Sequence, residues 1–273
     1  MIWQLLRSIK TLVLQASFLG LSLFPFSAFA QTNIRIVSEE FPPLQYQSKD
    51  SAAGYVHDFM LETIRRVKLN QPIAISSYEF LPWKRALLEA EHTPNTLLFA
   101  LSRTPARENK YLWLGEVSNY QQSLHRLKSN PMNIKSFKQA KEQGLSISIQ
   151  NGSAVTDYFI KQGLQYGVDF HYSMNYQQGI QQLFNGRVDL IALSEITARQ
   201  AACQEGFDGD QLVPQIPIQA LAKPLWAVFN KDTPTQLVDA FRKEMINIRN
   251  EGLFDFYYEK HMQHWNSLPC LAQ

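Results

Sequence analysis

Apolar and polar residues alternate with two different periods along most of this chain. Residues 55–69 carry apolar side chains three and four positions apart, the spacing of one helix face. Comparable segments predict further helices at 83–91, 154–161, 176–184 and 196–203, and two more after residue 234. Short β-rich or continuously apolar runs predict strands at 33–37, 72–79, 96–101, 145–150, 168–172, 188–193 and 225–229.

Strands that alternate with helices predict a mainly parallel sheet with helices on its faces. The run 96–101 is apolar throughout, as expected for a strand that is covered on both sides. The alternation restarts after residue 128 and therefore suggests two α/β lobes of similar size. The sequence contains no long glycine- or serine-rich linker, so whatever joins the lobes is short.

The first thirty residues have the pattern of a secretory signal. Arg7 and Lys10 precede an apolar run at 12–26, and the small-x-small site Ala28-Phe29-Ala30 follows it. The run of about 15 residues is shorter than the ~20 that span a bilayer as a helix. We therefore expect an exported, periplasmic protein cleaved after Ala30. An uncleaved membrane anchor is the alternative.

Charge and cysteine content narrow the function. Removing Arg7 and Lys10 from the 26 basic residues leaves 24, which balance the 24 acidic residues. This argues against nucleic acid or an anionic membrane as the main partner, because both favour a basic surface. Cysteine and histidine spacings do not resemble a zinc site, and we expect no cofactor. Cys203 and Cys270 can form a disulfide in an oxidising compartment, or they are two unrelated thiols.

The segment after the strand at 96–101 contains a candidate anion-binding arginine. Thr104 suits a helix N-cap and Pro105 the first helical position, so the pattern predicts a helix with Arg107 in its first turn. A cation is disfavoured there by the helix dipole, which makes Arg107 a candidate site residue. Its guanidinium could bind a carboxylate through two parallel hydrogen bonds. The alternative is an exposed arginine that pairs with Glu108 or with a loop acid.

Three other loops follow predicted strands, where open α/β sheets bind ligands. Gly152 and Ser153 begin a predicted helix whose N–H groups suit an anion, although an ordinary connecting loop has the same pattern. The loop 39–44 presents Phe41 through two prolines, or it closes the core. Trp83 starts a helix, where it either covers a ligand or packs in the interior.

Together these segments resemble the family-3 periplasmic solute-binding proteins, the polar amino-acid receptors of ABC importers. The resemblance covers essentially the whole chain after the signal. Its motifs, in order, are EEFPPLQY with GYVHDFMLETIRRV, PWKRAL, SRTPAR, IQNGSAVTDYF, FNGRVDLIALS and IRNEGLFDFYYEKH.

The resemblance implies a type II periplasmic-binding-protein-like fold of two lobes joined by two crossing segments. Lobe I would comprise residues 31–121 and 222–273, and lobe II residues 122–221. The crossings would lie near 120–128 and 216–223.

The resemblance also implies a ligand site. Arg107 matches the arginine that binds the ligand α-carboxylate, with Ser102 beside it. Gly152 and Ser153 match the loop that holds the carboxylate from lobe II. Phe41 and Trp83 match aromatic residues that flank the ligand.

Two positions depart from the family pattern. Ser194, followed by Glu195, stands where the family commonly has an aspartate that binds the α-ammonium group. Ser38, followed by Glu39, stands at another position that is commonly acidic. Either the acids have moved by one residue, or the ligand lacks a typical α-ammonium group.

The resemblance implies a monomeric, non-enzymatic binding protein that captures a small carboxylate-bearing ligand and delivers it to an ABC permease. Two alternatives remain on the same scaffold. One is a ligand sensor that docks on a membrane signalling receptor. The other is an enzyme like the dehydratases of cyclic carboxylates, with Glu195 as the general acid.

Overall fold

The computed structural model describes residues 31–48 and 51–270. The predicted signal and its cleavage after Ala30 lie outside the described residues. Within the described ranges, no helix is both long and apolar enough to cross a membrane.

Within this part of the chain there are two five-stranded sheets, and the first has the order β4-β1-β5-β12-β6. β1 pairs in parallel with β4 and β5, whereas β12 pairs antiparallel with β5 and β6. β6 therefore runs in the direction of β5, and four of the five strands share one direction. The strands are β1 (Thr32–Ser38), β4 (Ile73–Phe80), β5 (Thr96–Ser102), β6 (Tyr111–Ser118) and β12 (Leu225–Asn230).

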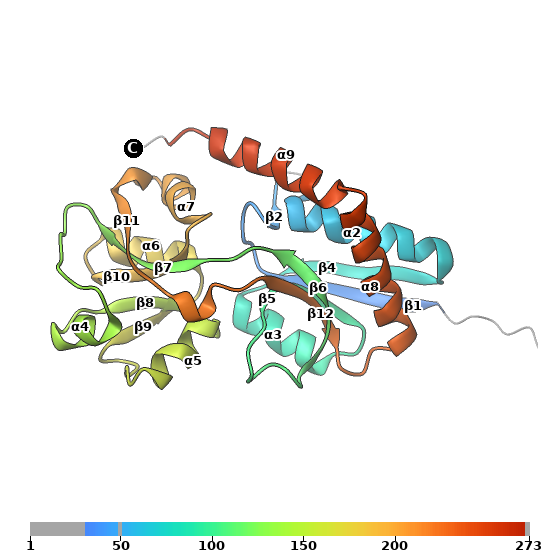
Figure 1. The fold of residues 1–273 in the computed structure, drawn as a ribbon, viewed down its shortest axis with the longest axis horizontal. Helices are drawn as coiled ribbons and strands as arrows, with labels where there is room; N and C mark the ends of the chain where they lie inside the picture. Colours follow the sequence, from blue (N-terminus) through green and yellow to red (C-terminus); the bar gives the residue numbers. More distant parts are fainter. Residues whose placement is uncertain (1–30, 49–50, 271–273) are drawn as a thin grey trace, which may run out of the picture. The chain divides into compact units, whose positions relative to one another are not determined.

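Helices cover both faces of this sheet (Figure 1). Leu97 and Phe99 pack into one core, whereas their neighbour Leu98 packs into the core under α3. This alternation explains why the run at 96–101 is apolar throughout, as the sequence predicted. The helices are α2 (Tyr55–Asn70), α8 (Thr235–Asn250) and α9 (Leu253–Ser267) on one side, and α3 (Trp83–His92) on the other. A short pair, β2 (Tyr46–Gln47) and β3 (Ala52–Ala53), precedes α2.

The second sheet repeats this plan in the order β11-β7-β10-β8-β9. Its parallel pairs are β10–β8 and β8–β9, and β7 pairs antiparallel with β10 and β11. The strands are β7 (Gln122–Leu127), β8 (Ile147–Gln150), β9 (Phe170–Ser173), β10 (Leu190–Ser194) and β11 (Leu212–Pro217). The helices are α4 (Phe137–Glu142), α5 (Ala154–Lys161), α6 (Tyr176–Phe184), α7 (Ala198–Gln204) and the short η1 (Gly209–Gln211) and η2 (Gln219–Leu221).

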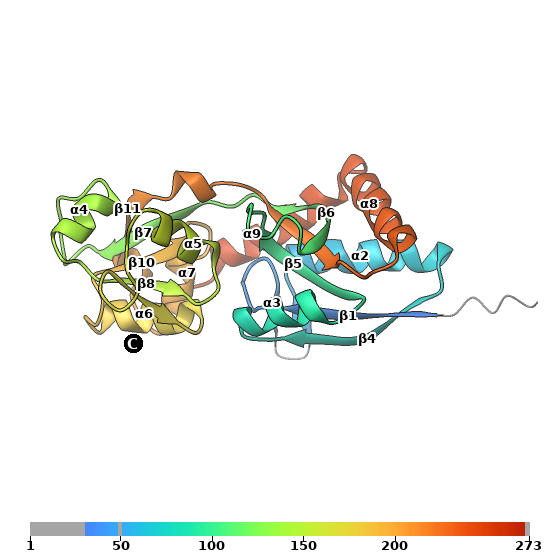
Figure 2. The same cartoon turned by 90° about the horizontal axis from the view of Figure 1, so that it is seen from below.

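The chain passes twice between the sheets (Figures 1 and 2). It leaves the first sheet after Ser118 and enters β7 at Gln122, and it returns between Pro217 and Leu225. The two sheets and these connections confirm the predicted α/β fold class, including the predominance of parallel strands. The predicted lobe bounds of 31–121, 122–221 and 222–273 stay a prediction.

The helix predicted to begin at Thr104 is wrong. Residues 105–110 form turns instead, with the Arg107 N–H bonded to the Thr104 carbonyl at 2.9 Å and the Lys110 N–H to the Arg107 carbonyl at 3.0 Å. The Arg107 side chain folds back to bond the Ser102 carbonyl. β6 starts at Tyr111, so these turns occupy the whole segment in which the helix was expected.

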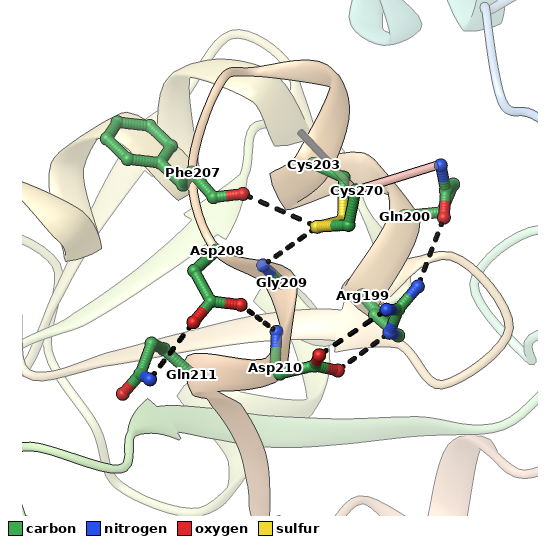
Figure 3. Close-up of a disulfide and its surroundings, with 9 residues drawn as sticks. All are labelled: Arg199, Gln200, Cys203, Phe207, Asp208, Gly209, Asp210, Gln211 and Cys270. Atoms are coloured by element: carbon green, nitrogen blue, oxygen red, sulfur yellow. Dashed lines mark hydrogen bonds and ion pairs between the residues drawn. A yellow bond between two sulfur atoms is a disulfide. The ribbon is translucent and has the colours of Figure 1, made fainter. Parts of the chain in front are cut away.

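The two cysteines form a disulfide, Cys203–Cys270, with Cα atoms 4.8 Å apart (Figure 3). Cys203 lies on α7, beside the second sheet, and Cys270 follows α9, which packs on the first. Of the two interpretations that the sequence left open, the structure has the disulfide.

Candidate functional site

A cavity lies between the two sheets, at the carboxyl ends of their parallel strands. The ends of β1 and β5 contribute one wall, and the ends of β8 and β10 the other. Its lining residues include Glu39, Phe41, Gln45, Trp83, Ser102, Arg107, Tyr120, Gln122, Gln150, Ser153, Ser173, Tyr176, Ser194 and Thr197. This is the edge where open α/β sheets bind their ligands.

Arg107 is a buried cation in the lining of this cavity, and the residue is 8% exposed. Its Nη1 donates to the Ser102 carbonyl at 3.1 Å and its Nη2 to the Gly152 carbonyl at 2.9 Å. No carboxylate of the described residues lies within ion-pair distance of it. Desolvation lowers the pKa of the guanidinium, although the charges of Tyr111 and Asp157 oppose this shift. A buried charge without a carboxylate in contact is costly, so the site favours an anion.

The Gly152 carbonyl accepts hydrogen bonds from two side chains that belong to the side of the first sheet. The Trp83 indole Nε1 donates to it at 3.1 Å, in addition to the Arg107 bond. Gly152 adopts φ +80°, in the left-handed region that L-residues disfavour. The Gly152-Ser153 turn is therefore held against α3 and Arg107, and the two sheets meet at this point.

Three buried oxygens in the cavity have no hydrogen-bond partner among the described residues. They are Ser153 Oγ at the start of α5, Ser194 Oγ at the end of β10, and Gln45 Oε1 in the loop after Phe41. Buried polar atoms are normally bonded, so each orphaned one needs an explanation, such as a functional role or a bound water or ion. The two serine hydroxyls can donate to an anion beside Arg107, whereas Gln45 Oε1 can only accept a hydrogen bond and suits a donor group.

Glu39 is the acidic residue of the cavity lining. Its Oε1 accepts a hydrogen bond from the Gln150 amide at the end of β8. Burial raises the pKa of Glu39 to about 8, although the Gln150 bond opposes this shift and the charge of Glu40 adds to it. Burial raises the pKa of Tyr120 and Tyr176 as well, and the charge of Glu39 contributes to both. The cavity lining therefore contains one cation, Arg107, and one acid, Glu39, whose protonated form is favoured by burial.

Aromatic rings enclose the space between these polar groups. Phe41 and Tyr120 pack edge to face with ring centroids 6.0 Å apart and planes at 83°. Trp83 is 7% exposed, so most of its ring is buried. Flat apolar walls with a few converging polar groups are typical of small-molecule sites.

The structure brings most of the predicted site residues to this cavity. Arg107, Ser102, Phe41, Trp83, Ser153, Ser194 and Glu39 all line it. Gly152 contributes through its carbonyl. Glu195 does not line it: its side chain is exposed and accepts a hydrogen bond from Ser123 Oγ at 2.6 Å.

Sequence reasoning missed the neutral half of the lining. Tyr120 and Gln122 lie where the chain first passes between the sheets, in a segment without a periodic pattern. Gln150 immediately precedes the recognised Gly152-Ser153 turn, and its position at a strand end was the available signal. No group of three or more potential metal ligands occurs within residues 31–48 and 51–270.

Comparisons of sequence do not assign this chain to a family, whereas comparisons of structure identify its fold. No family model matches the chain, and no curated protein matches it. Among solved structures, one from work on glutathione import through GshT and the cystine ABC importer TcyBC of Streptococcus mutans has a TM-score of 0.71 at 17% identity. The match covers 85% of this chain and 95% of that one.

Two further solved structures cover 84% of this chain and 95% of their own. A histidine kinase sensor domain with similarity to periplasmic binding proteins has a TM-score of 0.70 at 12% identity. The ancestral amino-acid-binding protein AncCDT-1, a precursor of cyclohexadienyl dehydratase, has a TM-score of 0.67 at 16% identity. These likenesses confirm the predicted periplasmic-binding-protein-like fold.

Proposed function

We propose that this chain is an exported solute-binding protein of family 3 that captures a small carboxylate-bearing molecule, an amino acid or a relative of one. The observation that carries this proposal is Arg107, a buried guanidinium that faces the other sheet without an acidic partner among the described residues. The fold of the similar structures and the order of the sequence motifs support it.

The ligand carboxylate binds the guanidinium. Arginine has five N–H donors, and the carbonyls of Ser102 and Gly152 receive bonds from two of its nitrogens, which leaves donors for an incoming anion. The hydroxyls of Ser153 and Ser194 also donate hydrogen bonds to the carboxylate in this proposal. Both are buried in the cavity wall without a partner in the described structure. Charge-assisted bonds of this kind each contribute ~1.5–3 kcal/mol.

Glu39 binds the ammonium group of the ligand. It stands next to the position that is commonly acidic in the family, and it lines the cavity, whereas Glu195 does not. Burial raises the pKa of Glu39, and the positive charge of a bound ammonium group would favour the ionised carboxylate. The site therefore suits a molecule that carries both a carboxylate and an amine.

Ligand entry requires the walls of the cavity to separate. The cavity has a volume of about 70 Å³ in this conformation, well below the ~300–1,000 Å³ of typical small-molecule sites. The bonds from Trp83 and Arg107 to Gly152 join the two walls. Two lobes that open and close about their connecting segments meet this requirement, and the ligand shifts the equilibrium towards closure.

The closed form is recognised by the permease of an ABC importer in this proposal. A sensor that docks on a membrane signalling receptor is the second candidate, because the similar structures include a histidine kinase sensor domain. The chromosomal neighbours of the gene separate the two candidates. Adjacent permease and ATPase genes favour import, and an adjacent kinase or cyclase gene favours sensing.

A dehydratase is a weaker candidate. Its support is the likeness to AncCDT-1, which is itself an amino-acid-binding protein. The proposed general acid, Glu195, lies outside the cavity lining. We expect no new absorbance when the protein is mixed with prephenate, and product formation would revive this candidate.

A thermal-shift screen of amino acids, short organic acids and amines against the mature protein tests the proposed function. A ligand at 100 times its Kd stabilises the folded state by ~2.7 kcal/mol, which raises the Tm by several degrees. We expect amino acids or related carboxylates to give the largest shifts. If no carboxylate raises the Tm, or if amines without a carboxylate do so equally, the proposed ligand class is wrong.

A further inference from the structure

The C-terminal helix α9 packs against the first sheet but ends at the second. Phe254 and Tyr258 contact Tyr55 of α2 edge to face, with ring centroids 6.3 and 5.2 Å apart. His261 Nε2 lies 2.8 Å from Asp58 Oδ2, also on α2. These contacts fix the first three turns of α9 to the side of the first sheet (Figure 1).

The end of α9 contacts the turn that follows Ser194. Trp265 is 3% exposed, and its indole Nε1 donates to the Ile196 carbonyl at 3.2 Å. Ile196 lies between Ser194 and Thr197, which both line the cavity. A residue outside the cavity therefore holds the backbone of a loop that forms its wall.

The disulfide adds a covalent bond beside this contact. Cys203 lies on α7, the helix that follows Thr197, and Cys270 lies three residues after the end of α9. Gly209 packs closely against the disulfide and α7, because a Cβ at this position would approach Cys203 Sγ to 2.8 Å and the Arg199 carbonyl oxygen to 2.2 Å. The Arg199–Asp210 ion pair, at 2.7 Å, joins α7 to η1 at the same place (Figure 3).

The segment between α9 and the disulfide is too short to allow the two ends to move far apart. Leu268 and Pro269 alone separate Ser267 from Cys270, and Leu268 is already extended at φ −63° and ψ 132°. Each residue spans at most ~3.3–3.6 Å, so this segment gives little additional length. Figure 1 shows the end of α9 towards α7, well apart from the two segments that pass between the sheets.

We propose that α9, Trp265 and the Cys203–Cys270 disulfide form a third connection between the two sheets, which positions the Ser194–Thr197 loop and limits how far the cavity walls separate. Two connecting segments alone would permit a wide hinge motion. A third, covalent one at a different place restricts that motion. Trp265 is a positioning residue in this account, because it acts on the cavity through the Ile196 carbonyl.

Distance measurements without ligand test the limit on opening. Fluorophores are attached to keto-bearing residues at Leu69 and Ile160, which are 73% and 57% exposed, so that the cysteines stay untouched. We expect one narrow distance distribution in the oxidised protein. Reduction with a phosphine, or the C203A/C270A double variant, should add a population at longer distance. Identical distributions in all three samples would overturn the proposal.

Reductant added to C203A/C270A controls for effects elsewhere and should change nothing. If this variant does not unfold cooperatively, the reduced protein supplies the comparison. Because no ligand is added, the outcome does not depend on whether the proposed function is correct.

Hydrogen exchange tests the role of Trp265. The Trp265→Phe substitution keeps an aromatic ring but removes the donor to Ile196. We expect faster exchange of the Glu195 and Thr197 amides, which bond Gln121 and Ser194, with β12 unchanged. Phe256→Ala, at an exposed position on the same helix, is the matched control and should leave the loop unchanged. Unaltered loop exchange in Trp265→Phe would contradict the positioning role.

Discussion

At the scale of the residue, the site depends on two ionisable groups, Arg107 and Glu39. Both line the cavity, and neither forms an ion pair within the described residues. Glu39 offers a measurable consequence, because burial raises its pKa to about 8 from an ordinary value of 4.5. Between these values the unfolded chain releases the proton that the folded protein keeps. Rising pH therefore favours unfolding over this window, and the contribution levels off above about pH 8.

We predict that Glu39→Gln removes this pH dependence. The Tm of the ligand-free protein should fall less between pH 5 and pH 8 in the variant than in the wild type, since glutamine does not titrate. Thermal unfolding across that range measures the difference. Glu40→Gln, an exposed neighbour, should retain the wild-type slope. Parallel curves for wild type and Glu39→Gln would mean that Glu39 is ionised like an ordinary surface acid.

The residue types of the site were largely visible in the sequence, but their partners were not. Arg107 stood out as a cation near a strand end, although the helix predicted around it does not form. Glu195 looked as suitable as Glu39, since both are acids beside strand ends. The structure places Glu39 in the cavity and bonds Glu195 to Ser123 outside it. The direction of a side chain at a strand end depends on the loop conformation, which spacing does not determine.

At the scale of the element, two helix starts near the cavity have different roles. Asn175 caps α6, its side chain accepting a bond from the Gln178 N–H at 2.9 Å, and Tyr176 of the cavity follows it. Ser153 occupies the corresponding position of α5, yet its hydroxyl makes no cap bond and is buried without a partner in the described structure.

We predict opposite effects from these two positions. Asn175→Ala should lower the free energy of unfolding by ~1 kcal/mol, the usual cost of a lost N-cap. Ser153→Ala should leave stability unchanged or slightly raised, because it removes an unbonded buried hydroxyl, and should weaken ligand binding. Denaturant unfolding and ligand titration of both variants measure this. A destabilised Ser153→Ala that binds ligand normally would assign Ser153 to the helix and not to the site.

Elements with a strong period were predictable, and half-polar ones were not. The helix α6 was predicted at its observed bounds, because its apolar residues lie on one face. The strands β6 and β7 were missed. Residues such as Gly115 and Glu116 interrupt the apolar pattern of β6, and His125 and Arg126 that of β7. Both segments form strands because they pair with β11 and β12, which lie far away in the sequence. A local pattern does not reveal such pairing.

At the scale of the whole molecule, the disulfide closes a long loop. Cys203 and Cys270 are 67 residues apart in sequence, and the loop includes the return to the first sheet and both C-terminal helices. Cross-linking such a loop reduces the entropy of the unfolded chain by an amount worth ~4 kcal/mol. Composition and compartment suggested the disulfide, but only the fold brings the two residues together.

We therefore predict that C203A/C270A lowers the free energy of unfolding by ~2–5 kcal/mol. Denaturant unfolding of the variant and the oxidised wild type at one protein concentration measures the change. Reduced wild type should resemble the variant. A difference below ~0.5 kcal/mol would mean that the cross-link contributes nothing to stability.

The central claim is that the buried guanidinium of Arg107 binds a ligand carboxylate between the two sheets. Arg107→Met tests it most directly, because methionine fills much of the same volume without charge. Isothermal titration should use the best carboxylate from the ligand screen and its primary amide, against wild type and variant. The account predicts that Arg107→Met stays folded and loses at least ~30-fold in affinity for the carboxylate, corresponding to ~2 kcal/mol or more, while the amide binds both proteins weakly. Carboxylate affinities within twofold of each other in the two proteins would contradict it.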